Sequence, residues 1–194
     1  MANLEPLIQS IPVAPLKLAS LEGCRTLADQ VNNYLVSFRH ESPTNVGQAD
    51  SLQGYCADSY LLECECPRFG SGEGKGVLKE SVRGCDLFIM VDVTNYSLTY
   101  RVNGYENHMS PDNHYQDLKR IISAADGKAR RINVIMPFLY EGRQHKRSKR
   151  ESLDCALMLQ ELVDMGVSNI LTFDAHDPRV SNSIPLHGFD SFMP

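Results

Sequence analysis

Short apolar runs, each bounded by polar or turn-forming residues, recur along the chain. Runs of this length that are rich in valine, isoleucine, leucine and phenylalanine are typical of strands buried on both faces of a parallel sheet. We therefore expect a strand at each of these runs. They are Leu16–Ala19, Tyr60–Cys64, Leu87–Val93, Ile132–Phe138 and Ile170–Phe173.

Between these runs, apolar residues recur at the spacing of amphipathic helices. The alternation of strands and helices predicts an α/β fold, with a mostly parallel sheet flanked by helices and joined by right-handed crossovers. The predicted apolar faces are Leu27, Val31, Tyr34 and Leu35 on the first helix, Leu118, Ile121, Ile122 and Ala125 on the second, and Leu153, Ala156, Leu157, Leu159, Leu162 and Val163 on the third.

The last predicted unit indicates where a ligand would bind. A helix is expected from about Ser152 to Met165, with Gly166 as its terminator, before the strand Ile170–Phe173. In open α/β sheets, ligands bind outside the carboxyl ends of the strands. We therefore expect segments 139–150 and 174–178 to lie on one functional rim.

Composition limits the possible classes of protein. A length of 194 residues, 42% of them hydrophobic and 22% charged, suits one sizeable domain and is short for two. The net charge of -5 argues against a surface built mainly for DNA or an anionic membrane. No stretch approaches the roughly 18–20 apolar residues of a membrane span, and the N-terminal residues lack the apolar run of a secretory signal. We expect a cytoplasmic protein whose six cysteines, none in a C-x-x-C pair, are reduced thiols.

The densest charged feature is the basic loop, residues 143–150, with the sequence Arg-Gln-His-Lys-Arg-Ser-Lys-Arg. In an acidic protein such concentrated cations repel one another unless an anion meets them. The loop lies between a buried strand and the start of a helix, and guanidinium groups and helix N-termini both bind phosphate oxygens. Its position favours a polyphosphate site. A solvated loop and a weak nucleic-acid patch are the alternatives, and the overall acidity disfavours nucleic acid.

A second candidate follows the strand Ile170–Phe173. If the strand end is extended, Asp174 and His176 project to one side and Asp177 faces elsewhere. A carboxylate and an imidazole can hold Mg²⁺, which keeps waters and phosphate oxygens in its other positions. The alternative is that the aspartate caps a turn and the histidine packs on the sheet. Three further histidines, His40, His108 and His114, lie in polar stretches and are expected at the surface.

A third candidate is the glycine-rich turn, residues 68–75, with the sequence Arg-Phe-Gly-Ser-Gly-Glu-Gly-Lys. It fails the phosphate-loop pattern G-x-x-x-x-G-K-[ST], because Phe69 and Gly76 stand where glycine and a hydroxyl residue are required. Phe69 could instead stack on a base, with Ser71 and Glu73 reading the amino edge of that base.

Taken in order along the chain, these motifs resemble those of ribose-phosphate diphosphokinase, also called phosphoribosyl pyrophosphate synthetase. The resemblance spans roughly residues 16 to 194 and implies a phosphoribosyltransferase-like fold. The matching segments are Leu16–Ser20 with the family's opening strand, Arg68–Glu73 with R-F-x-[DN]-x-E, Glu80–Gly84 with E-S-V-R-G, Pro137–Gln144 with P-Y-x-x-Y-x-R-Q and Leu171–His176 with T-x-D-x-H.

The resemblance implies an enzyme of nucleotide biosynthesis that transfers diphosphate from ATP to the C1 hydroxyl of ribose 5-phosphate, releasing AMP. The cofactor would be Mg²⁺, and the turn would reach the adenine across a subunit boundary of a homo-oligomer, with no role for a membrane. Catalytic residues stay unassigned. The implied site residues are Phe69, Ser71 and Glu73 beside the adenine, Arg143 and Gln144 at the nucleotide and its phosphates, and Asp174 and His176 at the metal.

Departures from the family pattern leave an alternative open. His145 replaces an aspartate, Ser183 and His187 stand where the family has aspartates, and the region Tyr96–Asn113 is longer than usual. The family's second half, with its ribose-phosphate loop, is missing. We therefore expect residues 1–194 to be one α/β domain, the ATP-side N-terminal half of a synthetase without its C-terminal half, inactive alone. The alternative is a catalytically silent regulatory subunit associated with a synthetase.

Overall fold

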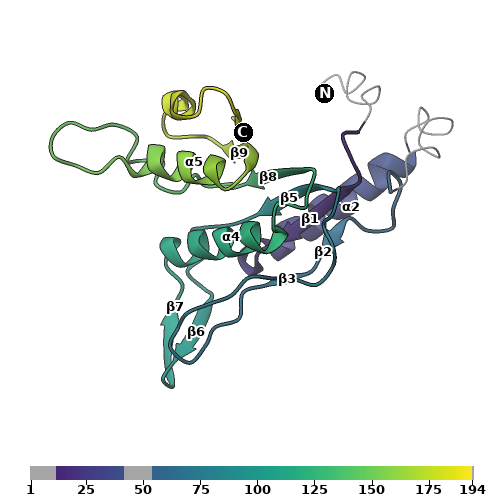
Figure 1. The fold of residues 1–194 in the computed structure, drawn as a ribbon, viewed down its shortest axis with the longest axis horizontal. Coiled ribbons are helices and arrows are strands. Elements are labelled where there is room, and N and C mark those ends of the chain that lie inside the picture. Colours follow the sequence, from purple (N-terminus) through teal and green to yellow (C-terminus); the bar gives the residue numbers. More distant parts are fainter. Residues whose placement is uncertain (1–11, 42–53, 194) are drawn as a thin grey trace.

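The computed structural model describes residues 12–41 and 54–193. Its centre is a six-stranded sheet in the order β10-β9-β8-β5-β1-β2, and every neighbouring pair is parallel (Figure 1). This sheet confirms the predicted fold class, and each predicted apolar run contributes a strand to it. The strands are β1 (Leu16–Ser20), β2 (Leu61–Leu62), β5 (Asp86–Met90), β8 (Arg131–Ile135), β9 (Val167–Phe173) and β10 (Gly188–Phe192).

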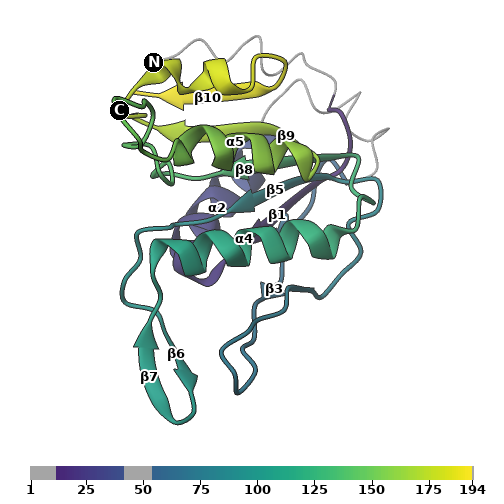
Figure 2. The same cartoon turned by 60° about the vertical axis from the view of Figure 1, so that its left-hand side comes forward.

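Helices cover both faces of the sheet (Figures 1 and 2). Neighbouring residues of a strand alternate between the two faces. Leu87 and Ile89 of β5 accordingly pack in the core beneath α4 and α5, whereas Met90 packs with Ala28 of α2 in a second core. One short apolar run thus contributes side chains to the cores on both faces of the sheet. The helices are α2 (Arg25–Glu41), α4 (Pro111–Ala125) and α5 (Asp154–Asp164), with 3-10 turns η1 (Glu22–Cys24) and η3 (Pro178–Ser183).

The predicted apolar face is confirmed for α4 and wrong in part for α2. All four predicted residues of α4 are buried. On α2, Leu27 and Tyr34 are 37% and 63% exposed, and the buried residues are Ala28 and Asn32. Asn32 is buried because its side-chain oxygen accepts the backbone N–H of Tyr60 at 2.8 Å, which ties the helix to the chain entering β2. The buried face of α2 therefore includes a polar residue, and it differs from the face that the apolar spacing predicted.

The last helix has the predicted position and a partly different buried face. It ends at Asp164, and Gly166 follows with a φ of 92°, the left-handed conformation expected of a helix terminator. Leu157 was predicted to face the core but is 57% exposed. Cys155 and Met158 are buried in its place, so the apolar stripe is rotated around the helix.

The edge strand β10 was not predicted. Its residues alternate in exposure, with Phe189 packed against the core and Phe192 51% exposed. Because an edge strand is paired on one side and half covered, it needs no continuous apolar run, and the signal used for the other strands is absent from it.

Two antiparallel hairpins project from the sheet beside α4 (Figure 2). The larger one turns through Asn103 and Gly104, whose φ angles are 50° and 84°. Asn-Gly in this left-handed conformation is the preferred sequence of a two-residue hairpin turn. This hairpin falls in the polar region that was assigned no structure from sequence. The strands are β3 (Cys64–Glu65) with β4 (Val77–Leu78), and β6 (Thr99–Val102) with β7 (Tyr105–His108).

A polar network ties neighbouring strands of the sheet together. Arg131 donates two hydrogen bonds to Asp86, at 2.8 and 2.6 Å, across the β5–β8 pair. Asn133, which is 1% exposed, donates to Asp86 at 2.8 Å and accepts from Asn169 of β9 at 2.6 Å. Because buried polar groups must keep their partners, this network fixes the register of three strands.

Within the described ranges, no helix is both long enough and apolar enough to cross a membrane. The N-terminal residues that were compared with a secretory signal lie outside the described part of the chain.

All six cysteines are unpaired thiols. Burial raises the thiol pKa of Cys64 and of Cys155 to about 11, and that of Cys24 and of Cys66 to about 12. Cys56, in contrast, is exposed. The buried thiols therefore act as small apolar groups and not as nucleophiles.

We predict selective alkylation of the native protein by iodoacetamide at pH 8. Cys56 should react first, because the thiolate is the reactive form and a thiol with a pKa of about 11 is ionised in about one molecule in a thousand at that pH. Peptide mass spectrometry gives the rate at each site, and urea-unfolded protein is the control in which all six should react. Equal native rates at Cys56 and Cys155 would contradict the prediction.

Candidate functional site

The loops that follow β8 and β9 leave the sheet side by side. Backbone pairing with β9 continues past the end of β8. The Met136 N–H donates to the Leu171 carbonyl at 2.8 Å, and the Phe173 N–H donates to the Pro137 carbonyl at 3.2 Å. Because the strands are parallel, both loops emerge at the same edge, as the sequence predicted for a functional rim.

A cavity of about 250 Å³ lies between these two loops. Arg143 lines it from the loop after β8, and Asp174 and His176 line it from the loop after β9. The structure therefore brings together three of the residues selected from sequence. The other lining residues, Phe138, Leu139, Gly142, Phe173 and Ala175, form a mainly apolar wall.

The backbone at Asp174 differs from the extended strand end assumed from sequence. Its φ of 48° is left-handed, and its N–H donates to the Phe192 carbonyl of β10 at 2.8 Å. The next N–H, of Ala175, donates to the Ser191 hydroxyl at 3.0 Å. Pairing with β10 therefore turns the chain sharply at the end of β9. Asp174 and His176 are both exposed and still line one cavity.

His145, the residue that departs from the family pattern, lies beside this cavity. Its ring centroid is 5.3 Å from that of His176, and its Nε2 is 3.3 Å from a carboxylate oxygen of Asp177. Asp177 also accepts hydrogen bonds from the Arg179 side chain, the shortest at 2.6 Å, and these hold the pKa of its carboxyl well below the usual range. This carboxylate is committed to protein partners and lies outside the cavity lining, in keeping with its expected orientation away from Asp174 and His176.

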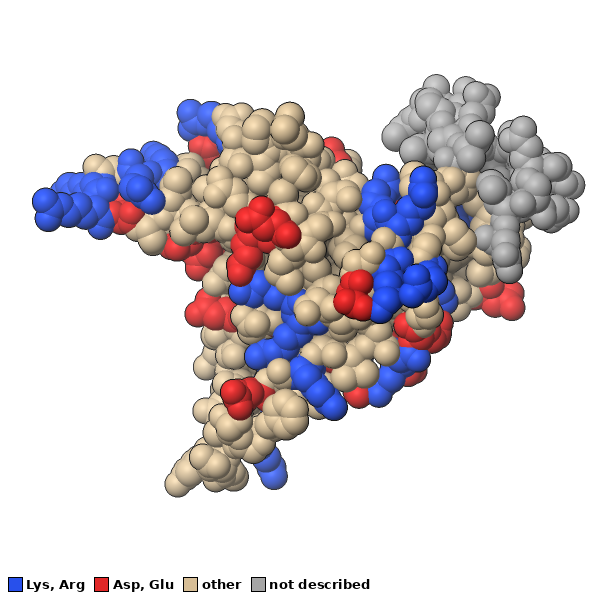
Figure 3. Space-filling model, in the orientation of Figure 1, with Lys and Arg blue, Asp and Glu red and all other residues tan. Residues whose placement is uncertain are grey.

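Gln144 links the two ends of the basic loop, which lie close together at its neck. Its side-chain amide donates to the Ser152 carbonyl at 2.8 Å and to the Lys146 carbonyl at 3.3 Å. Beyond this neck the loop projects from the molecule, and Figure 3 shows its cationic side chains grouped at one end. None of its cations forms an ion pair with a carboxylate of the described residues. These cations are Arg143, Lys146, Arg147, Lys149 and Arg150.

The rim provides two protein donors suited to a divalent cation. Asp174 supplies a carboxylate and His176 an imidazole to the same cavity. Across residues 12–41 and 54–193, no group of three or more histidine, cysteine, aspartate or glutamate side chains could hold a metal ion. The donor set therefore fits an ion such as Mg²⁺, which takes most of its ligands from water and phosphate oxygens.

The glycine-rich turn lies apart from this rim. The Phe69 N–H donates to the Glu73 carbonyl at 2.7 Å, and the Ser71 hydroxyl donates to the Glu73 carboxylate at 2.8 Å. The Phe69 ring is 53% exposed and free to stack on a ligand. Figures 1 and 2 place the β3–β4 loop, which carries this turn, beside the β6–β7 hairpin and away from β9 and β10. Within one chain, the proposed base-binding and phosphate-binding residues are not brought together.

A buried ion pair attaches the glycine-rich turn to α4. Arg68 donates to both carboxylate oxygens of Asp117, at 2.6 and 2.8 Å, and Arg120 donates to the same carboxylate at 2.6 Å. The Arg68 and Asp117 side chains are only 9% and 6% exposed. The sequence motif contained Arg68, but its partner on a helix distant in sequence carried no local signal.

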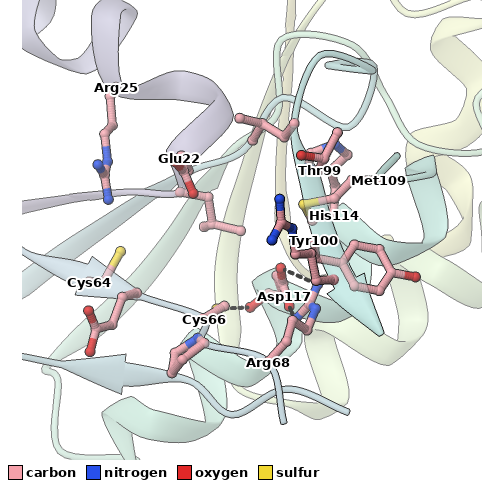
Figure 4. Close-up of a pocket in the computed structure, with 15 residues that line it drawn as sticks. Glu22, Arg25, Cys64, Cys66, Arg68, Thr99, Tyr100, Met109, His114 and Asp117 are labelled. Carbon is pink, nitrogen blue, oxygen red and sulfur yellow. Dashed lines mark hydrogen bonds and ion pairs between the residues drawn. The ribbon is translucent and has the colours of Figure 1, made fainter. Parts of the chain in front are cut away.

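A second cavity, of about 490 Å³, separates the turn from the chain that follows β1. Figure 4 shows Arg68, Asp117 and Tyr100 together on one side of it. His114, expected at the surface, is 2% exposed, and its Nε2 lies 2.8 Å from the Asn95 carbonyl. That expectation was wrong because His114 lies on the buried side of α4, beneath the chain that enters the β6–β7 hairpin.

Three comparisons with known proteins all match enzymes of one family. Residues 16–166 match the model of a family described as the N-terminal domain of ribose phosphate pyrophosphokinase. Curated ribose-phosphate pyrophosphokinases of Corynebacterium ammoniagenes and Bacillus cereus are each 29% identical over 175 residues, which cover 88% of this chain and 44% of theirs. The crystal structure of phosphoribosylpyrophosphate synthetase from Mycobacterium smegmatis aligns with a TM-score of 0.67 at 23% identity, covering 92% of this chain and 48% of that one. The chain thus spans less than half the length of these relatives.

We predict that Asp117→Ala destabilises the protein by about 3–5 kcal/mol, because it leaves the Arg68 guanidinium buried without its carboxylate. Urea unfolding followed by circular dichroism measures the change. The matched control is Glu80→Ala, which breaks an exposed ion pair with Lys17 and should cost less than about 1 kcal/mol. Similar losses in the two variants would show that the Arg68–Asp117 pair does not anchor the turn.

Proposed function

Because the chain belongs to the ribose phosphate pyrophosphokinase family, whose N-terminal domain it matches over residues 16–166, we propose that it is the ATP-binding half of such an enzyme. The proposed reaction transfers diphosphate from ATP to the C1 hydroxyl of ribose 5-phosphate and yields phosphoribosyl diphosphate and AMP. The observation that carries the proposal is the single cavity shared by Arg143, Asp174 and His176.

The phosphate side of the proposed site follows from the chemistry of the rim. The Arg143 guanidinium would bind the ATP phosphates, and the cationic loop beyond it would raise the local concentration of the polyanion. Asp174 and His176 would hold Mg²⁺, which supplies charge neutralisation to the phosphoryl oxygens when bound. Gln144, whose amide closes the loop neck, would position Arg143 as well as contact the nucleotide. We assign no catalytic acid or base to this chain.

The adenine side of the proposed site would come from a second copy of the chain. Phe69 would stack on the base, and Ser71 and Glu73 would bind its amino edge. Because the glycine-rich turn lies away from the rim of its own chain, a site that contains both parts requires a homo-oligomer. Ribose 5-phosphate would be bound by a second, C-terminal half, in keeping with the coverage of 44% of the curated relatives. The six unpaired thiols support a cytoplasmic location.

A second candidate function is a catalytically silent subunit that associates with a synthetase. The observation that favours it is His145, which stands in place of a family carboxylate and pairs with Asp177. Such a subunit would keep nucleotide binding and assembly without turnover. Its signature is ATP affinity in a complete protein that forms no AMP.

We predict that Arg143→Ala and His176→Ala each weaken Mg·ATP binding to the complete protein by about 1–3 kcal/mol, the scale of a charge-assisted contact. Isothermal titration calorimetry measures the affinity. Arg130→Ala is the matched control, because this exposed arginine precedes β8 and so lies at the opposite edge of the sheet; it should leave binding unchanged. Unchanged affinity in both rim variants would remove the proposed phosphate site.

We also predict that residues 1–194 alone form no AMP from ATP and ribose 5-phosphate, because the ribose 5-phosphate site would lie in the other half. A coupled assay for AMP, run beside the complete protein, tests this division. Turnover by the fragment would overturn it, and turnover by the complete protein would exclude the silent subunit.

A further inference from the structure

The β6–β7 hairpin makes direct contact with the glycine-rich turn. Gly72, at the apex of the turn, has a φ of 92°, and a Cβ added there would lie 2.9 Å from Cγ2 of Val102. The Arg68 guanidinium, at the base of the turn, lies 5.3 Å from the centre of the Tyr100 ring. Alternate residues of one strand, β6, thus touch both the base and the apex of the turn.

The turn and the hairpin are also anchored on the same helix. Arg68 is bound to Asp117 of α4, as described above, and His114, one turn earlier on α4, is bonded to the Asn95 carbonyl at the entrance to the hairpin. The hairpin base is closed by the Met109 N–H, which donates to the Leu98 carbonyl at 2.9 Å. Helix, turn and hairpin are therefore connected to one another along one side of the cavity of Figure 4.

The turn needs such support to bind a base. It contains Gly70, Gly72 and Gly74, with Gly76 just beyond, and glycine loses more backbone entropy than any other residue when it is fixed. An exposed turn of this composition would be ordered only on binding, at a cost to affinity. The hairpin touches the backbone of the turn and leaves Phe69 53% exposed. It can therefore hold the turn without covering the surface that would meet the ligand.

We propose that the β6–β7 hairpin is a positioning element for the base-binding turn, and that Tyr100 and Val102 are its positioning residues. The proposal rests on the proposed function, in which Phe69, Ser71 and Glu73 bind adenine. It predicts that the hairpin affects ATP binding and leaves the ribose 5-phosphate side and the rate of transfer unchanged.

The test measures ATP affinity by calorimetry, and KM and kcat where the complete protein turns over. Val102→Ala and Tyr100→Leu should each weaken ATP binding roughly tenfold, equivalent to about 1.4 kcal/mol. The KM for ribose 5-phosphate and kcat should change less than about twofold, which separates positioning from general damage. Glu106→Ala is the control on the same hairpin, because this exposed residue of β7 pairs with Arg101 and so lies on the opposite face of the hairpin from Tyr100 and Val102.

A double-mutant cycle tests the contact itself. Gly72→Ala would place its Cβ against Val102 and should weaken ATP binding more than tenfold, a loss of more than about 1.4 kcal/mol. Adding Val102→Ala removes the opposing methyl group and should recover part of that loss, so the two effects will not add. Additive losses would mean that this contact does not position the turn.

Phe69→Ala separates failure of this proposal from failure of the proposed function. If Phe69→Ala weakens ATP binding and the Tyr100 and Val102 variants do not, the hairpin has no positioning role. If Phe69→Ala itself leaves ATP affinity unchanged, the turn does not bind the base and both proposals fall. Circular dichroism melting of each variant confirms that the fold is retained, and the milder Val102→Ala carries the test if Tyr100→Leu does not fold.

Discussion

The parallel pairing of β8 with β9 is the constraint on which the candidate phosphate site depends. The chain after β8 stays hydrogen-bonded to β9 up to Phe173, the last residue of that strand, so the two following loops leave the sheet together. Arg143 and His176, far apart in sequence, line one cavity for this reason. A slip of one residue would turn the side chains of β9 to the opposite faces. The part-buried hydrogen bond from the Asn169 amide to the Asn133 side-chain oxygen opposes such a slip, because the slip would break it.

Helix α4 positions the other part of the candidate site, the glycine-rich turn. Its apolar side packs on the sheet, while Asp117 holds the glycine-rich turn and His114 holds the entrance to the β6–β7 hairpin. A flexible turn is thereby attached to a rigid element by charged and polar contacts that are almost fully buried. The same helix also contacts the rim, because the Tyr140 hydroxyl, in the loop after β8, donates to Asp112 of α4 at 2.6 Å.

The central strands could be predicted from sequence because burial on both faces leaves a continuous apolar run. The three predicted helices left a periodic apolar pattern, because each packs on the sheet by one face. The same argument explains what was missed. Strand β10 is a half-covered edge, and α2 buries Asn32 through a hydrogen bond that no apolar pattern reveals. The hairpin carries a turn signal, Asn103-Gly104, but its strands are too polar for apolar patterning to mark them as strands. The shared rim followed from strand topology, whereas the left-handed turn at Asp174 depends on pairing with the unpredicted β10.

Local charge, and not net charge, decides what the rim can bind. The chain carries a net charge of -5, yet none of the lysines and arginines of the basic loop forms an ion pair with a carboxylate of the described residues. The nearby Asp177 pairs with Arg179 and lies 3.3 Å from Nε2 of His145, so its carboxylate is not available to the lysines and arginines of the loop. Arg179 also holds the pKa of Asp177 low, so this carboxylate stays ionised at neutral pH and remains a partner for His145. Since no carboxylate of the described residues pairs with these lysines and arginines, under the proposed function the bound polyphosphate would relieve their mutual repulsion.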